Sequence, residues 1–107
     1  MSDTQDLQIL PEDRVQLTQD QKNLIELAFE KQVPPEDAEF IEKVQKEAQT
    51  GGNPFTRLSE YFTAKYGLDF GMILLSAIMG GREKYQETVD SIEKLRAQER
   101  VRKQKIN

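Results

Sequence analysis

The chain has 107 residues, a net charge of −4, and no cysteine, histidine or tryptophan. This length allows one small domain, and the lack of cysteine excludes a disulfide framework and thiolate chemistry. Charged residues make up 32% of the chain and apolar residues 36%, which predicts an ordered middle with polar ends.

The charges are distributed unevenly. Residues 1–50 hold 12 acids and 5 bases, a net charge of −7, whereas residues 51–107 hold 7 acids and 10 bases, a net charge of +3. A chain with acidic and basic halves can pair head to tail with a second copy, or present opposite charges to two partners. Solvated helix faces of unequal composition would give the same distribution.

Residues 1–16 are expected to form an irregular N-terminal arm. Their apolar residues follow no helical period, and Pro11 interrupts any run. The first residues have neither a basic region nor an apolar stretch, so no signal peptide is expected. The default location is therefore the cytoplasm, which also suits a chain without cysteine.

Residues 17–81 are expected to form a helical core, and its first two helices have recognisable boundaries. Thr18 and Gln21 have the spacing of a capping box at the start of a helix. Pro34 stops that helix, because proline lacks the amide hydrogen and clashes with the preceding turn. Pro35 then suits the first position of a second helix.

The sequence Gly-Gly-Asn-Pro at 51–54 predicts a break, followed by a third helix over about 55–66. The block 68–79 comes next and is the only concentrated apolar stretch of the chain. It is too short to span a bilayer, which needs about 20 apolar residues. We therefore expect a buried core helix with the other helices around it, and no membrane association.

Residues 82–107 are predicted to form a charged C-terminal helix with a basic tail. They follow Gly80 and Gly81, a pair that can bend a helix, end it or admit a second backbone. The apolar residues thin out along this segment, so the helix would be marginal in isolation and needs a partner. We expect it to project from an all-α bundle of about four helices, with the bundle, a second copy or another protein as its partner.

Catalytic and metal-binding motifs are not convincing in this chain. Ser91 and Lys94 have the spacing of some acylating serine enzymes, but the chain is too short for that fold. Acidic pairs such as Glu26 and Glu30 have the spacing of a helix surface, and no calcium-loop pattern is present. We expect no enzyme activity, catalytic residue, metal ligand or cofactor.

The leading hypothesis for function is protein binding through an amphipathic helix docked in a groove. The protein would act as an adaptor, chaperone, assembly factor or inhibitor of a larger machine, and its partner would be another protein or itself, as a homo-oligomer. The residues predicted for this contact are apolar and lie on the last helical segments: Tyr85, Val89, Ile92, Leu95, Met72 and Met79.

The basic tail supports an alternative function, nucleic-acid binding. Six basic residues stand against one acid between positions 94 and 107, enough to bind phosphates or an acidic protein surface. The same cations would also complement the negative end of a helix dipole. The residues predicted for such contacts are Arg96, Arg100, Arg102, Lys103 and Lys105.

Overall fold

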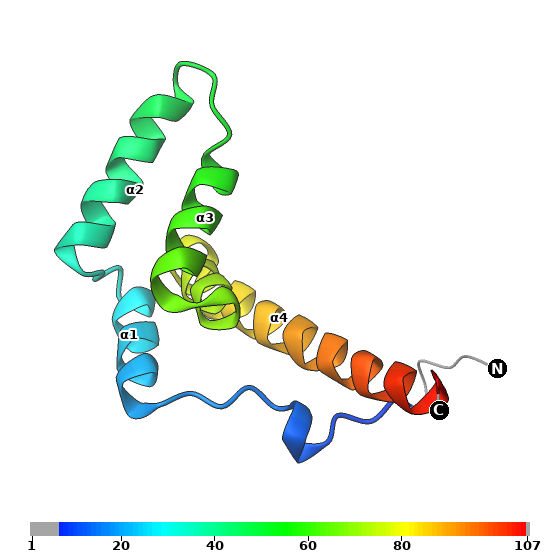
Figure 1. Ribbon diagram of the computed structural model, residues 1–107. Helices are drawn as coiled ribbons and strands as arrows, with labels where there is room; N and C mark the ends of the chain where they lie inside the picture. Colours follow the sequence, from blue (N-terminus) through cyan, green and yellow to red (C-terminus); the bar gives the residue numbers. More distant parts are fainter. Residues whose placement is uncertain (1–6, 107) are drawn as a thin grey trace.

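The computed structural model describes residues 7–106, and the side chains of residues 7–104. Within this range every regular element is helical, so the prediction of a small all-α bundle with a long charged C-terminal helix is confirmed (Figure 1). The elements are a short 3₁₀ helix, η2 (Pro11–Asp13), followed by α1 (Gln19–Phe29), α2 (Pro35–Ala48), α3 (Pro54–Tyr66) and α4 (Leu68–Ile106).

The boundaries of α1 come from local hydrogen bonds. The Thr18 hydroxyl accepts from the Gln21 amide at 3.1 Å, and the Gln21 side chain accepts from the Thr18 amide at 2.9 Å, which completes the predicted capping box. The helix ends earlier than expected, because Lys31 adopts a left-handed conformation with φ 63°. There the Gln32 amide donates to the Leu27 carbonyl at 2.8 Å and closes the helix.

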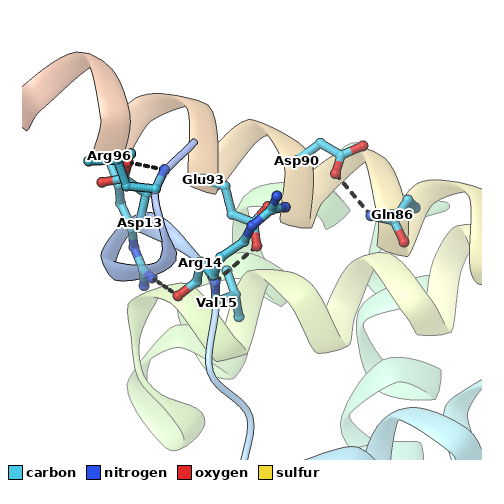
Figure 2. A network of polar contacts seen from close by, with 8 residues as sticks. Asp13, Arg14, Val15, Gln86, Asp90, Glu93 and Arg96 are labelled. Carbon is cyan, nitrogen blue, oxygen red and sulfur yellow. Dashed lines mark hydrogen bonds and ion pairs between the residues drawn. The ribbon is translucent and has the colours of Figure 1, made fainter. Parts of the chain in front are cut away.

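The long helix α4 reverses direction at Gly81. This residue has φ 70° and ψ −157°, a backbone conformation that is essentially restricted to glycine. The segments on either side, 68–80 and 82–106, therefore form an antiparallel hairpin. Figure 2 shows the two segments running alongside each other.

Two contacts between the segments establish the hairpin. The Ser76 and Thr88 hydroxyl oxygens are 2.5 Å apart, although the residues are 12 positions apart in sequence. Arg96 pairs with Asp69 at 2.5 Å across 27 positions. In a straight helix these pairs would be separated by about 18 and 40 Å, at a rise of about 1.5 Å per residue.

The expectation that the C-terminal segment projects from the bundle is therefore wrong. Segment 82–106 folds back because its apolar residues can be buried against the first segment of α4 and against α1. Val89 belongs to the buried core, and the partly buried side chains of Tyr85 and Ile92 pack against that core. The bundle itself is thus the partner that this marginal helix requires.

The apolar block of the sequence forms the centre of the core, as predicted. Ile73, Leu74 and Leu75 are at most 2% exposed. Gly71 lets this segment cross α3 closely, since a Cβ atom there would lie 2.5 Å from the Phe62 carbonyl oxygen. None of the helices in the described range has the length and apolarity needed to cross a membrane.

Candidate functional site

The large apolar side chains that stay exposed gather in one place. Among the described residues, Phe55, Leu68, Met79 and Leu95 are between 55% and 73% exposed, and all four line a single groove. The only other large apolar side chain classed as exposed in this range is Leu27, at 40%, which lies on α1 outside the groove. A gathered apolar surface of this kind is a candidate contact site.

This apolar groove lies between the start of α3 and the two segments of α4, and its volume is about 840 Å³. The α4 hairpin creates it, because the turn at Gly81 brings side chains from both segments to one surface. Lys84 and Glu87 lie on the groove near that turn. Four residues predicted for partner binding line the groove: Met72, Met79, Ile92 and Leu95.

The other two predicted residues, Tyr85 and Val89, contribute to the core. The Tyr85 ring meets the edge of the Phe29 ring of α1, with centroids 5.4 Å apart, and Val89 is 9% exposed. Burial, together with the carboxylates of Glu26 and Glu93, raises the pKa of Tyr85. These residues hold segment 82–106 against α1.

Phe55 and Leu68 line the groove but were not predicted for it. The helical period places Phe55 on the same face as the buried Leu58 and Phe62, and Leu68 begins the apolar block, so sequence reasoning assigns both to the core. Each lies at the start of a helix, directly after a break containing glycine. That position is the only sequence signal for their exposure.

The groove continues into a charged hollow of about 630 Å³ near the end of α4. The hollow shares Asp69, Ile92 and Leu95 with the groove, and Glu12 of the N-terminal arm forms part of its edge. Its charged lining also includes Asp13, Arg96, Glu99, Arg100 and Lys103. Apolar and charged surfaces therefore adjoin along one side of segment 82–106.

Three arginines of the predicted basic surface are paired with carboxylates. The pairs are Arg96 with Asp69 at 2.5 Å, Arg100 with Asp13 at 3.1 Å, and Arg102 with Glu99. Lys103 is exposed, and the side chain of Lys105 lies outside the described residues. Much of the positive charge of the tail is thus offset within the molecule.

The N-terminal arm lies across segment 82–106 and is held by polar contacts (Figure 2). The buried Glu93 carboxylate accepts from the Val15 amide at 3.0 Å and from the Arg14 guanidinium at 3.2 Å. Arg96 donates to the Arg14 carbonyl at 3.2 Å. The acidic and basic halves of the chain therefore meet within one molecule.

A second set of contacts fixes the arm near η2. The buried Asp13 carboxylate accepts from the Leu10 amide at 2.9 Å and pairs with Arg100, which also donates to the Gln8 carbonyl at 3.0 Å. The Leu10 hydrogen bond, followed by the contributions of Arg100 and Arg96, lowers the pKa of Asp13 against the opposing effect of burial. This carboxylate is therefore ionised at neutral pH.

A third charged cluster ties α2 to α3 and lies at Asp37, which is fully buried. Its carboxylate accepts from Lys65 Nζ at 2.7 Å, from the Tyr61 hydroxyl at 2.7 Å and from the Tyr66 hydroxyl. Burial alone would raise the pKa of Asp37, but the three donors together lower it. Burial and the carboxylate raise the pKa of Tyr66 to about 12. An ionised, saturated carboxylate is a poor general base, so we interpret this cluster as a structural clamp.

In the described part of the chain, no three acidic side chains lie close enough together to hold a metal ion. The apolar groove and its charged end are therefore the candidate site of this protein. Comparison with protein-family models, with curated proteins and with solved structures finds no match for this chain.

Proposed function

We propose that the protein is a non-enzymatic protein-interaction module and that the apolar groove is its contact surface. One observation carries the proposal: the four most exposed large apolar side chains of the described residues converge on this groove. Covering apolar surface contributes about 25 cal/mol per Å². A groove between helices suits an amphipathic helix that presents residues at i, i+3, i+4 and i+7.

The role that we propose is that of an adaptor, chaperone, assembly factor or inhibitor. The titratable groups with shifted pKa values support the absence of catalysis, because each has a structural explanation. Asp37 clamps α2 to α3, Asp13 fastens the N-terminal arm, and Tyr85 packs on α1. We place the protein in the cytoplasm, which a chain without cysteine suits.

Nucleic-acid binding by the basic tail is the weaker candidate. Arg96, Arg100 and Arg102 already pair with carboxylates, so phosphate contacts would have to displace those pairs. Such binding would fall steeply with salt. We therefore retain protein binding as the function that the geometry supports best.

Site-specific crosslinking in the native host tests this proposal. A photoreactive benzoylphenylalanine replaces Leu68 in the groove, and a matched control places it at Leu27, which is exposed on α1. We expect defined adducts from position 68 that disappear when Leu95→Lys is added, because a cation in the groove prevents apolar docking. No adduct at position 68, or the same adducts at position 27, would overturn the proposal.

A further inference from the structure

We propose that the occupant of the apolar groove is a second copy of this chain, docked groove to groove with the two 82–106 segments antiparallel. This inference rests on the proposed function, because it names the partner of the same surface. A two-fold axis makes the contact isologous, so every pairing across it occurs twice. Two α4 hairpins joined in this way form a four-helix bundle.

The charges along the groove support this arrangement. Lys84 and Glu87 line its end near Gly81, and Arg96 and Glu99 line its continuation beyond Leu95. Arg100 and Lys103 also line the continuation, and Glu99 is the one acid of segment 82–106 among them. Lys84 near the turn and Glu99 toward the other end become complementary when a second, identical segment runs in the opposite direction.

Opposition of Lys84 and Glu99 defines the register of that pairing. With the two-fold axis between Ser91 and Ile92, Lys84 and Glu99 lie equally far from the axis on opposite sides. Lys84 therefore faces Glu99 of the second copy, and by the same symmetry Glu99 faces Lys84 of the second copy. Electrostatic complementarity of this kind selects one register over its neighbours.

A shifted register is less favourable. Moving the axis so that Ile92 faces Leu95 of the second copy sets Lys84 against Lys103, and like charges placed opposite each other disfavour association. The register that sets Lys84 against Glu99 on both sides of the axis is therefore the one that we propose.

The apolar side chains follow the same symmetry. The contacts of Ser76 with Thr88 and of Asp69 with Arg96 place Met72 close to the level of the axis. Leu68 and Met79 lie toward opposite ends of segment 68–80. Rotation about the axis sets the Leu68 end of one copy against the Met79 end of the other, so both exposed side chains become covered.

The charged residues are free to exchange partners on association. Lys84 now pairs with Glu87 at 3.3 Å, and Glu99 pairs with Arg102, both as exposed i, i+3 pairs. Pairs of this type are weak in water, so the dimer contacts replace them at little cost.

Sedimentation equilibrium of the full chain with charge-swap variants tests the proposal. We expect a dimer for the unmodified chain and a Kd raised about tenfold or more by either Lys84→Glu or Glu99→Lys, because each sets like charges opposite each other. The double variant Lys84→Glu/Glu99→Lys should restore the dimer. Lys94→Glu changes an exposed cation of the same segment outside the groove and should leave the Kd unchanged.

Circular dichroism of each variant checks that the helices are intact. A monomer at about 100 µM would overturn self-association. An unchanged Kd in both single variants would overturn the proposed pairing, and so would a double variant that does not recover the Kd of the unmodified chain. The crosslinking experiment separates this failure from failure of the proposed function. A monomer whose position 68 crosslinks to another protein loses only the self-pairing, whereas a monomer with no adduct there loses both.

Discussion

Asp37 carries a charge in a place where water cannot reach it, and its surroundings explain how the fold tolerates this. Removing an ion from water is costly unless other groups compensate for the lost solvation. Here Lys65, Tyr61 and Tyr66 of α3 donate to the carboxylate. Asp37 thereby helps to fix α2 against α3, together with the stacking of Phe40 on Tyr61 and the ion pair of Glu47 with Arg57.

Removing one donor should weaken this clamp measurably. Tyr66→Phe should lower the free energy of unfolding by about 1.5–3 kcal/mol, the usual contribution of a hydrogen bond to a charged group. It should also raise the pKa of Asp37, because the Tyr66 hydrogen bond helps to lower that pKa. Urea denaturation and NMR titration of the carboxyl group measure the two effects, with Glu39→Gln, at an exposed carboxylate of the same helix as Asp37, as the control.

The pH dependence follows from the lowered pKa of Asp37. The ionised carboxylate stabilises the native state above the unfolded pKa of about 3.9, and this stabilisation is lost as pH falls through the lower native pKa. In Tyr66→Phe the pKa of Asp37 in the native state lies closer to its unfolded value. Acidification should therefore cost this variant less stability than it costs the unmodified chain. An unchanged acid-denaturation curve in this variant would contradict the clamp.

At the level of elements, the hairpin of α4 is the feature on which the groove depends. Both of its segments supply groove residues, and Gly81 joins them in a conformation that residues with a side chain avoid. The turn and the groove are therefore one structural unit, and a change at the turn should act on both.

Gly81→Ala should lower the free energy of unfolding by about 1–3 kcal/mol, because alanine is strained at this backbone conformation. Thermal or urea denaturation measures the effect. Gly52→Ala is the matched control, since an added Cβ atom there would meet nothing closer than 3.9 Å and the φ of Gly52 is not positive. Equal effects of the two substitutions would show that the turn does not require glycine.

The sequence predicted the elements better than their arrangement. Thr18, Pro35 and the break at 51–54 are local signals, because caps and turns depend on neighbouring residues alone, and the helices begin close to where these signals place them. The Gly80–Gly81 pair was compatible with a bent helix, a helix end or the close approach of a second backbone. The sequence could not decide between them, because glycine adopts positive and negative φ about equally readily. Phe55 and Leu68 lie at the start of helices after glycine-containing breaks, but the helical period assigns both to the core, because it marks an apolar face without showing what covers it.

At the level of the whole molecule, the N-terminal arm connects the start of the chain to the end of α4. Hydrogen bonds and ion pairs to Glu93, Arg96 and Arg100 hold it, together with the Val15 side chain, which packs against the core. Salt weakens ion pairs that are partly exposed. The arm should therefore respond to salt and pH more strongly than the apolar core does.

Asp13→Asn should loosen the arm, because it removes the charge that Arg100 contacts. Hydrogen exchange at the Val15 amide, which donates to Glu93, should become faster. Glu12→Gln, at the adjacent exposed carboxylate, is the control and should leave that exchange rate unchanged. Because the pKa of Asp13 is lowered, the unmodified arm should stay docked until the pH falls through that lowered value.

The hydrogen bond from Arg100 to the Gln8 carbonyl joins residues 92 positions apart, so it links the N-terminal arm to the end of α4. During synthesis the residues around Gln8 leave the ribosome first. They can form this contact only after Arg100 has also emerged. Closing so long a loop carries an entropic cost that grows slowly with length. We therefore expect this contact to form after the helices between Gln8 and Arg100 have assembled.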